Sequence, residues 1–416
     1  MKEEKLWNRN FFLLWQGSFI SSLGDTVYNI ALGFWILSVT GSPGIMGTVM
    51  ALSVLPVVLC SPLAGAVIDR FSRKSILVVM DLLRGTLIIL AGLALMFRIQ
   101  ALGIVFAVTI GSGICTAFFT PAVRSILPDL VPGKKLMAAN SFFNMSYVIS
   151  QICGMGGGGI LFGLFGAPLL FLANGISFFL SGISELFIKK TGRPQTGGTA
   201  LLNEIRAGYR FVWQFTGLKK ILLVSTAVNF FSFMGISLLI PLFNGIPDLG
   251  PGSYGIAMGV FAAGNLGGMI FSALYRMRAE NRYLFFISAT AGMTLFAFFI
   301  PLIINFPFIL VMAFCSGFLN ILVRIIFYTV SHMVIPDYIR GRFFSLQEAL
   351  SSALMPLAMA SGGILAEFIP VRPLMAAVFL LSSLIAITLV KSGESRNFIN
   401  FDPGTQTWEN LAGTAN

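Results

Sequence analysis

Charged residues are scarce in this sequence. Only 10% of its 416 residues are Asp, Glu, Lys or Arg, whereas 56% are hydrophobic, and the mean hydropathy is +0.88. Soluble domains carry about 25% charged residues, which they need to cover the surface of an apolar core. The shortage of charge therefore excludes a water-soluble fold and indicates an integral membrane protein.

Histidine and cysteine are also rare. The chain has one histidine, His332, and four cysteines, all within apolar stretches: Cys60, Cys115, Cys153 and Cys315. None of the patterns HExxH, CxxC, GxSxG or GxxxxGK[ST] occurs, so the sequence offers no zinc-protease, dithiol, serine-hydrolase or ATP-binding motif. We expect a protein that is not an enzyme and uses no cofactor, with the cysteines as packing residues.

Long apolar stretches are abundant. A membrane-spanning helix needs about 20 mostly apolar residues, and these stretches are continuous rather than alternating, which favours helices over a barrel. The expected spans are 11–38, 44–66, 76–97, 101–127, 137–163, 167–188, 220–244, 252–275, 284–304, 306–330, 342–369 and 373–391. The predicted fold class is therefore an all-α membrane protein with twelve transmembrane helices.

The net charge of +11 is explained by where the basic residues lie. Nearly all of them are in alternate connections between spans: before residue 11, at 70–74, at 134–135, at 189–220, at 276–282, at 340–342 and after 390. Basic residues mark cytoplasmic loops, so we expect both termini in the cytoplasm and a multi-pass protein of a bacterial-type cell membrane. The charge predicts topology, and we expect no nucleic-acid partner.

The chain divides into two halves. We expect an N-terminal six-helix bundle over 1–188, a cytoplasmic linker with an interfacial amphipathic helix over 189–219, a C-terminal six-helix bundle over 220–391 and a disordered cytoplasmic tail over 392–416. A repeat supports the division, because "LPDLVPGKKL" at 127–136 and "IPDYIRGRFF" at 335–344 follow corresponding spans. Parallel halves of this kind are typical of transporters that bind substrate between two bundles.

The connection after the second span carries a recognisable motif, "GAVIDRFSRK" at 65–74. With Gly65, Asp69, Arg70 and Arg73 in this spacing, the chain resembles the major facilitator superfamily. The stretches "FFLLWQGSFISSLGDTVYNIALGFW", "FFTPAVRSILPDLVP", "FLANGISFF" and "EIRAGYRFVW" resemble the branch of macrolide-efflux permeases and siderophore exporters. The resemblance covers the chain up to about residue 393.

The resemblance implies proton-coupled export of an amphipathic molecule by alternating access. Antiporters of the superfamily often carry Gly-Pro-x-x-Gly-Gly in the fifth span, where this chain has "GMGGGG" with Met155 in place of the proline. Whether that change alters antiport stays open. Gly154, Gly158 and Gly159 remain and allow a bend or a close helix contact.

Charges inside apolar spans need a reason, because each costs at least about 2.5–3.5 kcal/mol. Asp25 lies midway along the first span with Tyr28 and Asn29 nearby, and we hypothesise that it binds the coupling proton or a cationic drug. The alternative is a structural hydrogen-bond acceptor. Arg324, the most central basic residue, would pair with Asp25 across the two halves, unless it only lines the wall of the cavity.

Other polar residues complete the expected site. Asn144 and Gln151 would line the cavity, and Glu348 would serve as a second coupling group. Asp81 and Arg84 are three residues apart on one helix face, so we expect an intramembrane ion pair between them.

Glu185 and His332 lie near cytoplasmic span ends, where His332 is interpreted as an ordinary interfacial residue.

The motif at 65–74 is interpreted as a cytoplasmic gate. Gly65 would let helices pack closely. Asp69 would accept a hydrogen bond either from Arg124, which resembles the arginine that the signature Asp pairs with in relatives, or from the N-terminal end of a facing helix. Arg70 and Arg73 would hold the loop on the cytoplasmic side. We expect Asp69→Asn to slow conformational cycling with little effect on substrate affinity.

The expected partners are a small amphipathic substrate and the lipid bilayer, with the protein acting as a monomer powered by a proton gradient. Proton-coupled uptake and lipid transport within the same superfamily remain alternatives. A membrane sensor that keeps the fold without transport is a non-transport alternative.

Overall fold

The computed structural model describes residues 6–99, 102–189, 213, 216–275 and 277–402. Within these ranges the regular structure is helical and no strand occurs. The chain groups into two compact units, the first comprising residues 1–198 and 247–256 and the second 199–246 and 257–416.

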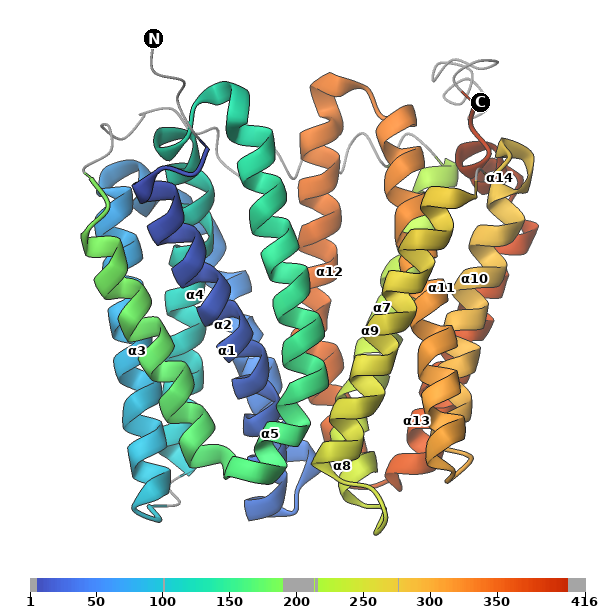
Figure 1. The fold of residues 1–416 in the computed structure, drawn as a ribbon. Coiled ribbons are helices and arrows are strands. Elements are labelled where there is room, and N and C mark those ends of the chain that lie inside the picture. Colours follow the sequence, from blue (N-terminus) through green and yellow to red (C-terminus); the bar gives the residue numbers. More distant parts are fainter. Residues whose placement is uncertain (1–5, 100–101, 190–212, 214–215, 276, 403–416) are drawn as a thin grey trace. The chain divides into compact units, whose positions relative to one another are not determined.

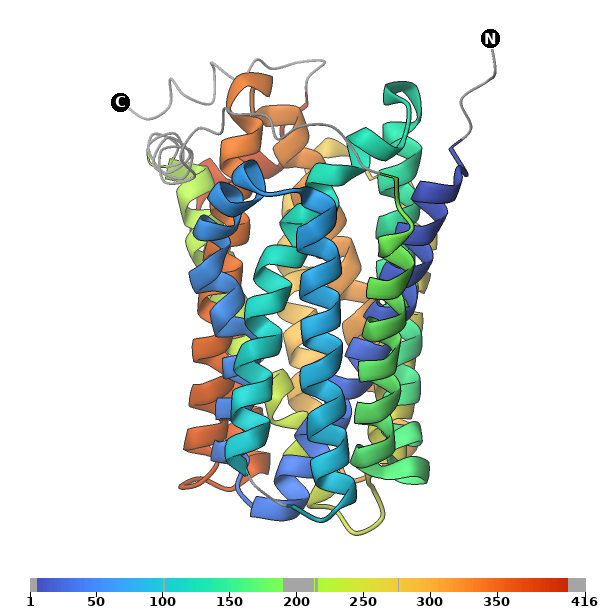
Figure 2. The ribbon, with the colours of Figure 1, turned by 90° about the vertical axis from the view of Figure 1, so that its left-hand side faces the viewer.

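The first unit is built from long helices that run side by side along one common direction (Figures 1 and 2). They are α1 (Arg9–Thr40), α2 (Pro43–Arg70), α3 (Arg73–Met96), α4 (Leu102–Leu130), a short 3₁₀ turn (Gly133–Lys135) and α5 (Leu136–Leu186). α1 and α3 both pack on α5, and α4 packs on α2 and α3.

The second unit has the same all-helical character. Its helices are α7 (Thr216–Ser237), α8 (Leu239–Asn244), α9 (Pro251–Leu274) from residue 257 onward, α10 (Ala279–Phe299), α11 (Phe306–Val334), α12 (Asp337–Leu365), α13 (Val371–Ile387), a 3₁₀ turn (Thr388–Lys391) and α14 (Gly393–Ile399). α10 packs on α11 and α13, while α7 packs on α12, α13 and α14.

Local sequence explains where the first helices begin. The side chains of Asn8 and Ser42 accept hydrogen bonds from Phe11 N and Ile45 N and so satisfy amides at the start of α1 and α2. α1 ends at Gly41, whose φ of 65° is left-handed and suits a residue without a Cβ. Capping residues therefore set the ends of these helices. α2 continues to Arg70, four residues beyond the predicted span that ends at 66.

The fifth and sixth predicted spans form one element, α5, which departs from helical geometry at Gly166. Gly166 has φ 70° and ψ 174°, a backbone conformation that side chains with a Cβ rarely adopt. Pro168 follows two residues later and removes a backbone donor. The two parts of α5, before and after Gly166, turn back so that both pack on α1.

Every predicted span overlaps a helical segment of the described chain, although the span 284–304 extends beyond α10 and the span 220–244 is divided between α7 and α8. Nine described segments are long and apolar enough to cross a membrane, and Val371–Ile387 is a shorter apolar helix. α1 is absent from that set. The all-helical membrane fold is confirmed, and the count of twelve crossings stays a prediction.

The prediction of disorder from residue 392 is wrong for the first part of the tail. α14 lies on α7, where Ser395 Oγ donates to the carbonyl of Gly217 at 3.2 Å. The Asn400 side chain accepts from Tyr283 N at 2.8 Å and donates to the carbonyl of Glu280 at 3.0 Å. Phe398, Ile399 and Phe401 of the segment are also buried in the core of the second unit, so tertiary packing orders this part of the tail. Residues 403–416, and most of the predicted linker helix at 189–219, lie outside the described residues.

Candidate functional site

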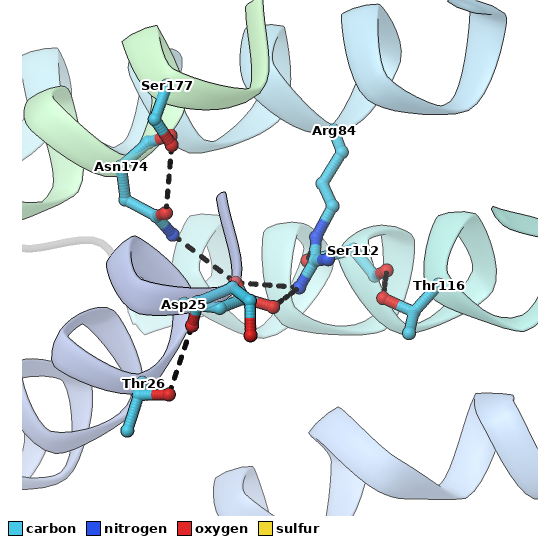
Figure 3. A network of polar contacts seen from close by, with 8 residues as sticks. Asp25, Thr26, Arg84, Ser112, Thr116, Asn174 and Ser177 are labelled. Carbon is cyan, nitrogen blue, oxygen red and sulfur yellow. Dashed lines mark hydrogen bonds and ion pairs between the residues drawn. The ribbon is translucent and has the colours of Figure 1, made fainter. Parts of the chain in front are cut away.

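An ion pair joins α1 to α3 inside the first unit (Figure 3). One terminal nitrogen of Arg84, Nη2, lies 2.8 Å from Oδ1 and 2.6 Å from Oδ2 of Asp25. The side chains are 12% and 24% exposed, respectively. Charge-assisted hydrogen bonds of this length are roughly twice as strong as neutral ones, so the pair compensates two charges that would be costly alone in an apolar span.

Further contacts fix both partners. Arg84 Nε donates to Ser112 Oγ on α4 at 2.7 Å, and its guanidinium lies 4.2 Å from the ring centre of Phe178. Asn174, on the part of α5 after Gly166, donates through Nδ2 to Asp25 Oδ1 at 3.4 Å. Four helices therefore contribute to one polar network within an apolar unit (Figure 3).

Tyr28 extends this network by one helical turn. Its side chain is buried, with the ring packed on Phe171 at a centroid distance of 4.5 Å. Its hydroxyl is buried beside Thr109 of α4 and interacts electrostatically with Asp25 and Arg84. The predicted proximity of Tyr28 to Asp25 is therefore found.

Small residues allow the helices to approach closely enough for these contacts. A Cβ on Gly24 would lie 2.5 Å from Asn174 Oδ1, and a Cβ on Gly85 would lie 2.8 Å from the carbonyl of Gly175. Gly85 faces backbone atoms that cannot move aside, so glycine is needed at this crossing, whereas a Cβ on Gly24 would displace the Asn174 side chain that binds Asp25.

The glycines of the fifth predicted span pack on α1 in the same way. A Cβ on Gly154 would lie 2.6 Å from Thr26, and one on Gly158 would lie 2.8 Å from Ile30.

The predicted ion pair between Asp81 and Arg84 is not formed. Arg84 turns to Asp25 and Ser112, and the ion pairs of the described residues do not include Asp81. Asp81 is 1% exposed, and its Oδ2 has no hydrogen-bond partner. Spacing on one helix shows which residues share a face, but it does not show which neighbouring helix offers the better carboxylate.

The remaining predicted cavity residues are not joined to this network. In the first unit Asn29 and Asn144 are exposed, and Gln151 is half-buried. Arg324 and Glu348 are exposed residues of the second unit. The pairing of Asp25 with Arg324, and the cavity roles of these five residues, stay predictions.

The motif at 65–74 makes two of the contacts that organise one end of the first unit. Arg73 Nη1 lies 2.7 Å from Asp129 Oδ2 near the end of α4. Lys74 Nζ donates to the carbonyls of Leu186 and Ile188 at 2.7 and 2.6 Å, which satisfies the end of α5. We call this end, formed by the start of α1, residues 70–74 and the end of α5, the basic end.

Other expectations for the motif fare differently. A Cβ on Gly65 would meet nothing within 4 Å, so close packing does not explain this glycine in the described structure. Arg70 and Arg124 are exposed. The side chain of Asp69 lies outside the described residues, and its bond with Arg124 stays a prediction.

Sequence reasoning missed Asn174 and Ser112 as partners of the ion pair. Both are neutral, and small polar residues are common in membrane helices, so neither stands out in an apolar run. Asn174 did fall in "FLANGISFF", a stretch quoted for its resemblance. Among the described residues no three His, Cys, Asp or Glu side chains gather as metal ligands would.

Solved structures share this fold. A bacterial homologue of the human lysosomal transporter Spinster aligns with a TM-score of 0.68 at 15% identity, over 96% of this chain and 100% of that chain. The nucleoside transporter NupG aligns with a TM-score of 0.70 at 13% identity, over 95% of this chain and 100% of that chain.

Sequence relatives are transporters as well. Macrolide efflux protein A of Streptococcus pyogenes is 25% identical over 385 residues, 89% of this chain and 93% of that protein. The multidrug efflux pump Tap of Mycolicibacterium fortuitum is 27% identical over 362 residues, 83% and 86% of the two chains. The MFS-type transporter YfiS of Bacillus subtilis is 29% identical over 412 residues, 91% and 93% of the two chains.

The transmembrane secretion effector family matches residues 5–407. Together with the helical fold and the transporters it resembles, this match over almost the whole chain shows that the protein belongs to that family of major facilitator transporters.

Proposed function

We propose that this transporter exports amphipathic drugs, macrolides among them, in exchange for protons by alternating access. The names of the efflux relatives support the substrate class and the direction. The observation that carries the coupling is the ion pair of Asp25 and Arg84 within the helical unit. The energy source is a proton gradient, and no cofactor takes part.

The geometry of the pair explains how a proton would act on it. A carboxylate accepts two hydrogen bonds from the guanidinium, whereas a protonated carboxyl group loses its charge and much of its attraction for Arg84. A cationic drug that approaches Asp25 would compete with Arg84 for the same oxygens. Proton and substrate would therefore exclude one another at one carboxyl group, as exchange transport requires.

The orientation follows from the basic residues. The basic end carries Arg70, Arg73 and Lys74, and we place it in the cytoplasm of a bacterial-type cell membrane, together with both termini. The protein would work as a monomer in the lipid bilayer.

The experiment is an accumulation assay in a bacterium that lacks its own efflux pumps. Cells expressing the wild type, Asp25→Asn or Glu280→Gln would receive the macrolide erythromycin, the cationic dye ethidium and a siderophore. Glu280 is an exposed residue of the first turn of α10 and serves as the carboxyl-to-amide control.

The proposal expects lower accumulation of at least one compound in wild-type and Glu280→Gln cells, abolished by a protonophore and by Asp25→Asn. If Asp25→Asn pumps at the wild-type rate, Asp25 is not the coupling group. Increased accumulation would indicate uptake, and flipping of a labelled lipid would indicate lipid transport. Unchanged accumulation of every compound would remove drug export and favour the sensor alternative.

A further inference from the structure

Two acidic side chains of the first unit are buried and take no part in the ion pairs of the described residues, although the hydroxyl of Ser181 interacts with one of them, Asp81. Glu185, one residue before the end of α5, is 0% exposed, and neither of its carboxyl oxygens has a hydrogen-bond partner. Asp81 on α3 is 1% exposed and has one unpartnered oxygen. A buried carboxylate that lacks hydrogen bonds is strongly disfavoured, so such a group binds a proton and becomes neutral.

The two carboxyl groups lie in one column between α3 and the second part of α5. On α3, residues 74, 81 and 84 are separated by seven and three positions. On α5, residues 174, 178, 181 and 185 are separated by four, three and four positions. Each set therefore lies on one face of its helix. Known contacts fix the register, because Lys74 binds the end of α5 and a Cβ on Gly182 would lie 2.9 Å from Leu82. The column leads from the basic end to Arg84.

The charges around this column are few. Glu185 interacts electrostatically with Asp81, and Asp81 interacts with Arg84 and Asp25. Tyr28 on α1 and Cys115 on α4 are further titratable groups that interact with Asp25, Asp81 or Arg84. At the basic end of the column, Lys74 is bound to the end of α5.

In the described structure, Arg84 is the one positive charge that interacts with both Asp25 and Asp81, and it does not interact with Glu185. One guanidinium cannot neutralise three carboxylates. While Arg84 is bound to Asp25, the charges of these four residues balance when Asp81 and Glu185 are both protonated.

We propose that Asp81 and Glu185 form a proton-binding pair, and that loss of the proton from Asp81 moves the guanidinium of Arg84 from Asp25 to Asp81. Asp81 and Arg84 are three residues apart on one face of α3, so a side-chain rotation brings the guanidinium of Arg84 to Asp81. Asp25 is then released to bind a cationic drug. This inference rests on the proposed function for the identity of the drug, but not for the proton-binding pair itself.

The proton steps balance without any oxidant or reductant. The O–H bond of Glu185 first breaks and gives its proton to water at the basic end. The resulting carboxylate then takes the proton from the O–H group of Asp81. One proton has left the protein, Glu185 is neutral again, and the new charge of Asp81 is compensated by Arg84.

The first test does not depend on any substrate. Infrared spectra of the purified full chain in lipid would be recorded from acidic to alkaline pH for the wild type, Asp81→Asn, Glu185→Gln and the control Glu280→Gln. The proposal expects the absorption band of protonated carboxyl groups to persist at neutral pH in the wild type and the control. It expects each of the other two variants to lose part of that band.

Absence of the band from the wild type at neutral pH, or a loss in only one of the two variants, would overturn the proton-binding pair. The wild-type titration alone keeps the proposal testable if a variant fails to fold.

The second test addresses the movement of Arg84. Binding of ethidium and erythromycin to the wild type should strengthen as pH rises, because Asp81 loses its proton and Asp25 is freed. Asp81→Asn mimics the protonated state, so it should bind weakly and lose the part of the pH dependence that Asp81 causes, keeping only the part that comes from Asp25. Wild-type pH dependence in Asp81→Asn would overturn the switch, whereas failure of every drug to be exported would count against the proposed function and leave the infrared result standing.

Discussion

Arg84 binds both carboxylate oxygens of Asp25, which lies 59 residues earlier in the chain, and not the carboxyl group of Asp81 three residues away. The choice joins α1 to α3 and leaves Asp81 buried with an unpartnered oxygen. Stability and transport should therefore both depend on this choice.

Removing one partner of the pair should cost more than removing both. Arg84→Ala leaves the charge of Asp25 uncompensated in a mostly buried place and should destabilise the protein by about 3–5 kcal/mol. The double variant Asp25→Ala/Arg84→Ala should be less destabilised than the sum of the single variants, with a coupling of about 0.5–3 kcal/mol. Denaturant unfolding in detergent measures these values, and additive single effects would contradict the pairing.

Arg84→Lys keeps the charge but loses the planar guanidinium that binds Asp25 and Ser112 together. Lysine presents a compact ammonium without that geometry. We expect a loss of about 1.5–3 kcal/mol, the usual value of a hydrogen bond to a charged group, and loss of drug efflux. Retention of wild-type efflux by Arg84→Lys would show that charge alone is sufficient.

Close packing of α3 on α5 predicts a large effect of one added methyl group. A Cβ on Gly85 would lie 2.8 Å from Gly175 O and 2.9 Å from Phe179 N, which are backbone atoms and cannot move aside easily. Gly85→Ala should destabilise by about 1–3 kcal/mol. The matched control Gly103→Ala lies in the first turn of α4, meets nothing within 4 Å and should change stability by less than about 0.5 kcal/mol. Equal unfolding midpoints for the two variants would count against this crossing.

The ion pair between Arg73 and Asp129 connects the start of α3 to the end of α4, and its side chains are 13% and 26% exposed. Such a partly exposed pair adds only about 0.2–1 kcal/mol to stability. Asp129→Asn should therefore fold normally but slow the transport cycle, and the swap Arg73→Asp/Asp129→Arg should recover part of the rate. An efflux time course measures this, and an unchanged rate in Asp129→Asn would exclude a role in the gate.

Docking of α14 should depend on pH. The hydrogen bond from Lys220 lowers the pKa of Glu394, which has an exposed carboxyl group outside the apolar helices. Because docking lowers the pKa of Glu394, the charged carboxylate stabilises the docked state at pH values above the ordinary carboxyl pKa. That stabilisation is lost as pH falls through the lowered pKa. Hydrogen exchange of Gly393–Ile399 should accelerate on acidification in the wild type. In Glu394→Gln the rate should be fast already and show no such pH step.

The sequence predicts the helices well because a long apolar run marks a segment that crosses lipid as a helix. It misses α14, since "GESRNFI" has no long apolar run and folds through tertiary contacts, which include the bonds with Gly217 and Lys220 and the burial of Phe398 and Ile399. The gap between the expected spans at 163 and 167 does coincide with the kink at Gly166.

The candidate site is predicted only in part, for a related reason. Asp25 stands out because a charge in an apolar run is costly. Its partner depends on which helices become neighbours, and that information is spread over small residues such as Gly24 and Gly85. Glu185 reads as a residue at a helix end, although its side chain points into the unit and is fully buried.

The bonds from Lys74 to Leu186 and Ile188 join residues 112 and 114 positions apart in the chain. At a synthesis rate of about 5–20 residues per second, Lys74 leaves the ribosome roughly 6–22 s before its acceptors do. Asp25 and Arg84 are both made before these acceptors, so their pair can stabilise α1 and α3 as they enter the membrane. The last step in this order of synthesis is the arrival of the end of α5, whose carbonyls Lys74 then binds.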